Sequence, residues 1–168
     1  KSASPGETVR LRVVTTNNKA GHNFPSGPMD LLEPWLELIV ENEHTAVILH
    51  SGRLDERGYL EPDAHVLHKR ELDENGKSIE RHELWKIVRL GEDRTIPPKD
   101  SITDEWEATI PQDVLGPVKV TAVWKYRKAQ QHIVDALHGF KLLTDVATYP
   151  VMELNRAEGA IEIRPGGD

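Results

Sequence analysis

The sequence predicts an all-β fold, an antiparallel β-sandwich of immunoglobulin-like or jelly-roll-like type with two long ordered loops and one short helix. Apolar and polar residues alternate with a period of two in several segments, which is typical of strands that bury one face. Proline and glycine separate these segments where turns are needed. Because the 168 residues contain no repeat and no linker, we expect one domain over residues 1–168.

The expected strands follow from the alternation, and the clearest is 118–127, where apolar residues occupy every second position. The others are 7–16, 35–40, 46–50, 102–110, 145–154 and 159–164. In 102–110 one face is rich in apolar residues, so Trp106 is expected in the core, as is Trp124. We interpret the acidic group Asp104, Glu105 and Glu107 as a solvated face. Residues 128–140 have helical spacing, and Gly139 is a candidate cap.

Composition excludes several classes of function. The net charge of −7 argues against a nucleic-acid binder. No apolar run reaches the roughly 20 residues of a membrane helix, so no membrane span is expected. With no cysteine, the chain has no disulfide, no thiol chemistry and no covalent haem attachment through C-x-x-C-H. Because it begins at Lys1 without methionine or signal peptide, we expect a processed or excised piece.

Two segments do not fit the strand pattern. Residues 20–34 are rich in glycine and proline but carry His22 and Phe24, so we expect an ordered loop. Residues 51–84 are longer than the roughly 12–15 residues usual for a loop in a compact domain, which favours a functional segment. Their apolar residues argue against disorder, and the sequence 73-DENG-76 predicts a hairpin turn within them.

Histidines are concentrated in these two segments, and imidazole is the commonest transition-metal ligand. One hypothesis is a copper, zinc or iron site built from His22, His65 and His82, with Asp63 and His68 as further candidate ligands. The alternative is that these histidines bond to loop backbone and hold the loops in place. Spacing does not decide between the two, because His65 and His68 face opposite ways on a strand.

Several motifs in fixed order resemble the C-terminal β-sandwich region of multihaem c-type cytochromes. They are 21-GHNFPSG-27, a tryptophan-led strand, 51-SGRLDERGYLEPDAH-65, 80-ERHELW-85, 124-WKYRKA-129 and 149-YPVMEL-154, and they span roughly residues 20–155. In those proteins such segments follow an array of C-x-x-C-H haem sites. This chain departs from the pattern because it has no cysteine.

The resemblance implies an exported protein, periplasmic or extracellular, concerned with electron transfer. Haem c is expected in a parent or partner, and this domain is expected to pack against that haem-bearing module or another redox protein. His22, His65 and His82 are then the positions to suspect of ligating haem iron or a metal. Catalysis is not expected of the domain itself.

Two other functions stay open at this point, a metal-binding domain and a carbohydrate-binding module. The second needs coplanar exposed aromatic rings, and the chain has only four tryptophans, three tyrosines and two phenylalanines. The oligomeric state is left open.

Overall fold

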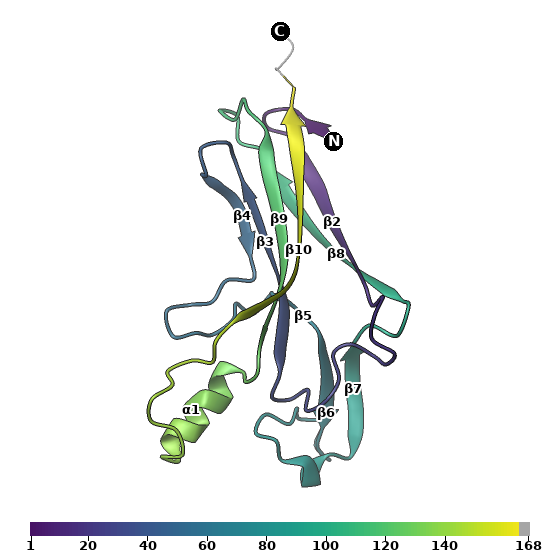
Figure 1. Cartoon of the computed structure of the whole chain (residues 1–168), viewed down its shortest axis with the longest axis vertical. Helices are drawn as coiled ribbons and strands as arrows, with labels where there is room; N and C mark the ends of the chain where they lie inside the picture. The colour runs from purple at the N-terminus through teal and green to yellow at the C-terminus, as the bar shows by residue number, and fades with distance from the viewer. Residues whose placement is uncertain (165–168) are drawn as a thin grey trace.

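The computed structural model describes residues 1–164, and two sheets face each other in it (Figure 1). The larger sheet has the strand order β1-β10-β9-β3-β4, and β5 also pairs with β3. Its strands are β1 (Ser2–Ala3), β3 (Glu33–Glu41), β4 (Val47–Ser51), β5 (His65–Val66), β9 (Val118–Arg127) and β10 (Met152–Ile163). The second sheet contains β2 (Thr8–Thr16) and β8 (Ser101–Thr109).

One end of the molecule, the lower end in Figure 1, holds the remaining elements, and we name it the long-loop end. It consists of segments 20–32, 52–96 and 128–151. Its regular elements are the antiparallel pair β6 (His68–Leu72) and β7 (Arg89–Arg94), the 3-10 turn η1 (Leu84–Lys86) and the helix α1 (Gln131–Gly139). The long-loop end is therefore assembled from three stretches that are far apart in the sequence.

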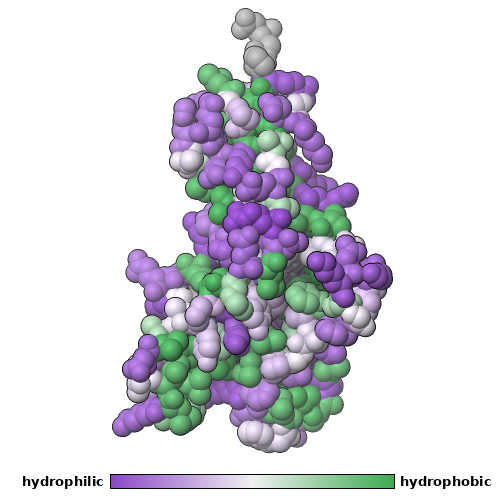
Figure 2. Space-filling view, in the orientation of Figure 1, coloured by the Kyte–Doolittle hydropathy of each residue, from purple (hydrophilic) through white to green (hydrophobic). Residues whose placement is uncertain are grey.

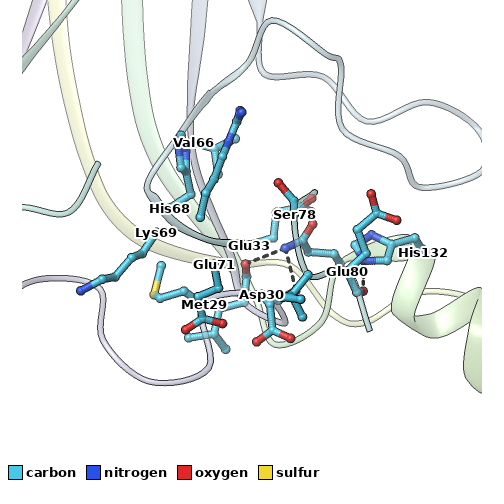
Figure 3. A pocket seen from close by; sticks show the side chains of 14 residues that line it. Met29, Asp30, Glu33, Val66, His68, Lys69, Glu71, Ser78, Glu80 and His132 are labelled. Carbon is cyan, nitrogen blue, oxygen red and sulfur yellow. Dashed lines mark hydrogen bonds between the residues drawn. The ribbon is translucent and has the colours of Figure 1, made fainter. Parts of the chain in front are cut away.

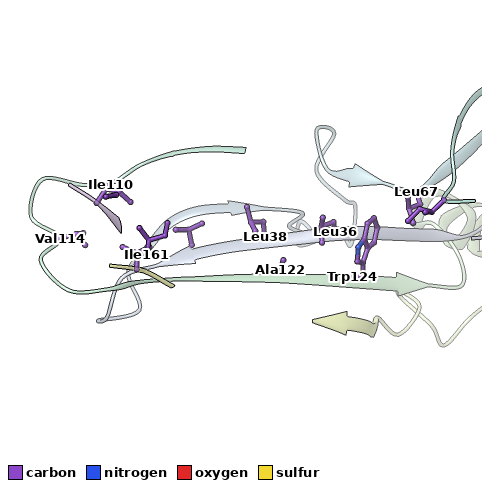
Figure 4. Packing of buried hydrophobic residues seen from close by; sticks show 12 residues of the cluster. Leu36, Leu38, Leu67, Ile110, Val114, Ala122, Trp124 and Ile161 are labelled. Carbon is purple, nitrogen blue, oxygen red and sulfur yellow. The ribbon is translucent and has the colours of Figure 1, made fainter. Parts of the chain in front are cut away.

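The all-β sandwich-like fold is confirmed, and its core lies between the two sheets. Leu36 and Leu38 of β3 and Trp124 of β9 are buried, and partly buried side chains of β2 and β8 pack against them. Figure 4 shows the cluster running lengthwise, from Ile110 at one end to Leu67 at the other. The alternation predicted this face, because each strand presents its apolar residues to the opposite sheet.

The long segment 51–84 is more regular than the sequence indicates. The hairpin turn at 73–76 is confirmed: the Asp73 side chain accepts hydrogen bonds from the backbone N–H groups of Asn75 and Lys77. Strands β5, β6 and β7 were not predicted. Their sequences lack alternation, because β6 (HKREL) and β7 (RLGEDR) are held together by charged side chains and backbone bonds more than by a buried face.

The end of the chain corrects two expectations. Residues 145–151 are not a strand, and 152–163 form one continuous strand in place of two. The backbone of 145–151 bonds elsewhere, with the Val146 carbonyl accepting from the His138 ring at 2.6 Å and the Ala147 carbonyl accepting from Gln131 at 2.9 Å. The predicted helix is present as α1, but Gly139 does not cap it. Lys141 adopts the left-handed conformation beyond its end, at φ 58°.

A fully buried arginine connects the larger sheet to the long-loop end. Arg127, at the end of β9, is 0% exposed and pairs with Glu33 of β3. Its Nη1 donates to the Gly58 carbonyl at 2.7 Å and lies 3.4 Å from the Thr148 hydroxyl. Burial raises the pKa of Glu33, and the neighbouring guanidinium opposes that rise. The loop after β4 and the segment before β10 are thus bonded to one buried cation.

Replacing this cation tests its structural role. Arg127→Met is expected to lower the free energy of unfolding by about 3–5 kcal/mol, because it leaves the buried Glu33 carboxylate without its counter-charge. Urea unfolding followed by circular dichroism measures the loss. The matched control is Arg12→Met on the exposed face of β2, expected to change stability by less than about 0.5 kcal/mol. Equal stabilities of the two variants would contradict the assignment.

Candidate docking face and histidine sites

The first predicted histidine lies in the loop after β2, and its ring is exposed. His22 Nδ1 lies 2.8 Å from the backbone carbonyl of Asn23. The loop is ordered as expected, because the buried Asn17 amide donates to the carbonyls of His22 and Ile96, at 2.9 and 3.0 Å. His22 is therefore held by its own loop, with Nδ1 as the bonded ring nitrogen.

The second histidine is bonded to a buried carboxylate. His65 of β5 contacts Asp104 of β8 through Nδ1 at 2.5 Å, and its ring stacks on Trp106 with centroids 4.3 Å apart. Arg94 of β7 pairs with the same Asp104 oxygen and donates to the Val66 carbonyl at 2.8 Å. This corrects the interpretation of Asp104 as part of a solvated face. Its side chain is 1% exposed, and its place among apolar residues in the alternation already indicated burial.

The third histidine repeats this arrangement with a second buried aspartate. His82 Nδ1 lies 3.1 Å from both carboxylate oxygens of Asp30, whose side chain is 3% exposed. His82 itself is 41% exposed and has a positive φ of 55°. Because Asp30 lies 52 residues earlier in the chain, no local pattern could indicate this pair.

The three predicted histidines differ from the other five in which ring nitrogen is bonded. In His22, His65 and His82 only Nδ1 has a hydrogen-bond or ion-pair partner within residues 1–164. In His50, His132 and His138 Nε2 is the hydrogen-bonded nitrogen, at 2.6 to 3.1 Å from an oxygen. In His44 and His68 Nε2 lies within ion-pair distance of a glutamate, at 3.8 and 3.1 Å, without a hydrogen bond. A carboxylate or carbonyl on Nδ1–H leaves the Nε2 lone pair available, the arrangement that metal-ligating histidines adopt.

The structure does not bring the three histidines together. Within residues 1–164 no group of three or more histidine, aspartate or glutamate side chains is arranged to hold a metal ion. The further candidates do not join them: Asp63 is exposed, and the His68 ring lies 3.1 Å from Glu92, whose pKa it lowers. A shared metal centre therefore stays a prediction without geometric support, and each histidine has to be considered separately.

A cavity of about 260 Å³ with both polar and apolar lining is bordered by Asp30, the partner of His82 (Figure 3). Four segments of the long-loop end surround it, 29–33, 66–71, 78–80 and 130–132, and carboxylates and basic side chains both line it. Gln130 donates to the Asp30 carbonyl at 3.0 Å, and the His132 ring bonds to the Glu80 carbonyl at 2.7 Å. The first bond holds the segment that carries Asp30, and the second holds the segment two residues before His82.

Exposed apolar side chains gather mainly in two segments. Apart from Val14, Val47 and Leu115, all the large ones belong to 84–90 or 140–154. We name the first group the 84–90 patch, which consists of Leu84, Trp85, Val88 and Leu90. Figure 2 shows apolar surface on both sides of the lower end of the molecule. Trp85 is 80% exposed and lies three residues after His82, so an exposed apolar side chain and an imidazole with a free Nε2 belong to the same short segment.

The remaining tryptophans are not on the surface, which bears on carbohydrate binding. Trp35 and Trp124 are buried, and Trp106 is partly buried against the core. Trp85 is thus the single exposed tryptophan of the four, and the tryptophans alone do not form a two-ring stacking platform.

Comparison with known proteins identifies a structural relative. No protein-family model matches the chain, and no curated protein sequence matches it. The fold is similar to a penta-heme cytochrome c552 from Thermochromatium tepidum, with a TM-score of 0.63 and 15% sequence identity. The match covers 96% of this chain and 38% of that cytochrome, so the chain spans little more than a third of its relative's length. At this identity the likeness shows a shared fold. The matched protein is a multihaem cytochrome, the class of protein that the sequence motifs of this chain resemble.

The buried aspartate of the His65 group gives a test of the site. Asp104→Asn is expected to lower the free energy of unfolding by about 1–3 kcal/mol, because Arg94 and His65 lose a charged partner in a largely buried place. The measurement is urea unfolding. Glu105→Gln, one position along β8 on the exposed face, is the matched control and is expected to be neutral. A neutral Asp104→Asn would show that the group does not contribute to stability.

Proposed function

We propose that this chain is a non-catalytic accessory domain that docks against the haem-bearing module of a multihaem c-type cytochrome, or against a redox partner, and so supports electron transfer. The observation that carries the proposal is the adjacency of His82, with its free Nε2, to the exposed 84–90 patch. An apolar surface suits the flat edge of a haem or its protein surroundings, and an imidazole can ligate iron from a different segment than the one that attaches the haem.

The fold likeness to a multihaem cytochrome supports the same function independently of the motifs. Residues for covalent haem attachment are absent, since the sequence has no cysteine. Residues for axial ligation fit, because three histidines present Nε2 and have Nδ1 bonded to oxygen. A bound haem would supply the redox chemistry, and this chain would orient the ligand and exclude water around it.

His82 is the first choice among the three histidines. Its Asp30 partner is buried and contacts it with both oxygens, so the ring is held more firmly than that of His22, which bonds to a neighbouring carbonyl. His65 is more covered, with a side chain 27% exposed and a ring stacked on Trp106. Because its ring is both exposed and held in orientation, His82 is the histidine that we expect to ligate the iron of a haem carried by another module or protein.

Location follows from the same proposal. Multihaem c-type cytochromes work outside the cytoplasm, so the domain is assigned to the periplasm or cell surface. Among residues 1–164 no helix has the length and apolarity that a membrane crossing requires. The net charge of −7 favours a partner with a basic face and an association that weakens with salt.

Binding through the 84–90 patch is tested with the haem-bearing region that carries C-x-x-C-H sites, taken from the same reading frame or from an adjoining gene. Calorimetry is expected to show saturable binding with a negative heat-capacity change, because apolar surface is buried. Trp85→Ser is expected to weaken binding about 30-fold, as the loss of an interface anchor does. Val47→Ser, an exposed apolar residue outside both apolar segments, is the control. Equal affinities of the two variants, or the lack of any such haem-bearing region, would contradict the proposal.

Ligation is tested with a haem c peptide that has one open axial position. The Soret spectrum is expected to shift to that of a six-coordinate low-spin iron on addition of this chain. His82→Ala should weaken the binding, and Asp30→Asn should weaken it by about tenfold, because the carboxylate orients the ring. His50→Ala is the matched control, since its Nε2 is already bonded to Glu37. If all variants shift the Soret band with the same affinity, His82 is not the ligand and this part of the proposal is wrong.

A further inference from the structure

The strand β10 has a long edge with no neighbour in the described structure. It pairs with β9 along one edge, and on the other edge β1 covers only Glu162 and Ile163. Every residue from Met152 to Ala160 is exposed, although each belongs to the strand. An edge of this length, with unpaired backbone groups, is a template for another strand.

The bonds to β1 show which backbone groups point outward. Glu162 N–H donates to the Lys1 carbonyl at 2.9 Å, and Arg164 N–H donates to the Ala3 carbonyl at 2.8 Å. The backbone N–H and C=O groups of successive residues in a strand point to opposite edges. The register with β9 is unbroken from Asn155 to Ile161, so this alternation continues along that stretch. The N–H and C=O groups of Arg156, Glu158 and Ala160 therefore point to the same open edge.

There is room beside this edge. Two hollows of about 260 and 380 Å³ lie between β10 and β2, lined on the β10 side by residues such as Asn155, Ala157 and Gly159. These inward-facing residues are small. Larger side chains, among them Arg156, Leu36 and Trp124, also line the first hollow.

We propose that a second copy of this chain occupies the edge, and that two β10 strands pair antiparallel about a two-fold axis at Ala157. The charges select this register. It places Arg156 of each copy opposite Glu158 of the other, which gives two cross-strand pairs of opposite sign. These pairs add to the ion pairs that Arg156 already makes with Glu153 and Glu158 of its own chain. Both pairs lie at positions whose backbone groups point outward, so they are the hydrogen-bonded pairs of the new ladder.

Neighbouring registers are disfavoured by the same residues. An axis at Arg156 places two arginines opposite each other, and an axis at Glu158 places two glutamates opposite each other; like charges in that position are destabilising. With the axis at Ala157 the inner face pairs Ala157 with itself and Asn155 with Gly159. The contact is short, so a dissociation constant in the micromolar range, about 10 μM, is expected in place of an obligate dimer.

Single cysteines test the register, because the chain has none of its own. Ala157→Cys is expected to form a disulfide dimer under mild oxidation, since Cα atoms in a non-hydrogen-bonded pair lie about 4.5 Å apart, within disulfide reach. Asn155→Cys and Gly159→Cys are each expected to stay monomeric and to cross-link only when mixed. A Cβ at Gly159 meets no atom within 4 Å, so that variant folds. Val47→Cys is the control for random collision.

Charge reversal gives an independent readout by sedimentation velocity. Arg156→Glu and Glu158→Arg are each expected to abolish the dimer, because each places like charges opposite in both pairs. Mixed in equal amounts, the two variants are expected to form a heterodimer. Circular dichroism confirms that each variant is folded.

Three results would overturn the proposal. They are a wild-type chain that is monomeric at about 1 mM, a hundred times the expected dissociation constant; cross-linking of Ala157→Cys no faster than that of Val47→Cys; and charge variants that dimerise like the wild type. If the haem-bearing module covers this edge in place of a second copy, we expect the first result, a wild-type chain that stays monomeric.

Discussion

Arg127 carries a permanent positive charge at a place with no solvent contact, and most of its polar contacts are with the long-loop end. Only its Nη2 has no hydrogen-bond partner within residues 1–164. Its partners come from four stretches of the chain: Glu33 at the start of β3, the Gly58 carbonyl, Gln131 of α1 and the Thr148 hydroxyl. A buried charge without such partners is too costly to keep in the fold. Segments that are far apart in the sequence are therefore held to one another through a single buried cation.

The molecule thus has two kinds of interior. Between the sheets, apolar side chains such as Leu38 and Val118 pack in the way that alternation dictates. At the long-loop end, buried charge pairs accompany buried apolar side chains such as Leu67 and Val134. Asp104 joins β5, β7 and β8 through His65 and Arg94, and Asp30 holds His82. Because these carboxylates are buried, they fix the orientation of the histidine rings that they bond. An imidazole that is to ligate a metal needs such a fixed orientation.

Two surfaces of the chain are chemically different, and the two proposed contacts rest on this difference. The 84–90 patch is apolar and beside a free imidazole nitrogen, which suits a haem-bearing surface. The edge of β10 is polar, with Arg156 and Glu158 in a self-complementary order, which suits a second copy. The first lies at the long-loop end and the second along the sandwich, so the two contacts do not compete for the same residues.

Local sequence was enough to predict the sandwich-like fold, the positions of most of its long strands along the chain and the lack of residues for covalent haem attachment, because period-two alternation and composition are local properties. It also indicated the three histidines, through their concentration in the two loops. Tertiary structure alone decided that Asp30, 52 residues from His82, is its partner, that Asp104 is buried, and that β6 and β7 pair. Those contacts join distant segments through desolvated charges, and the cost of burying a charge depends on neighbours that local sequence does not specify.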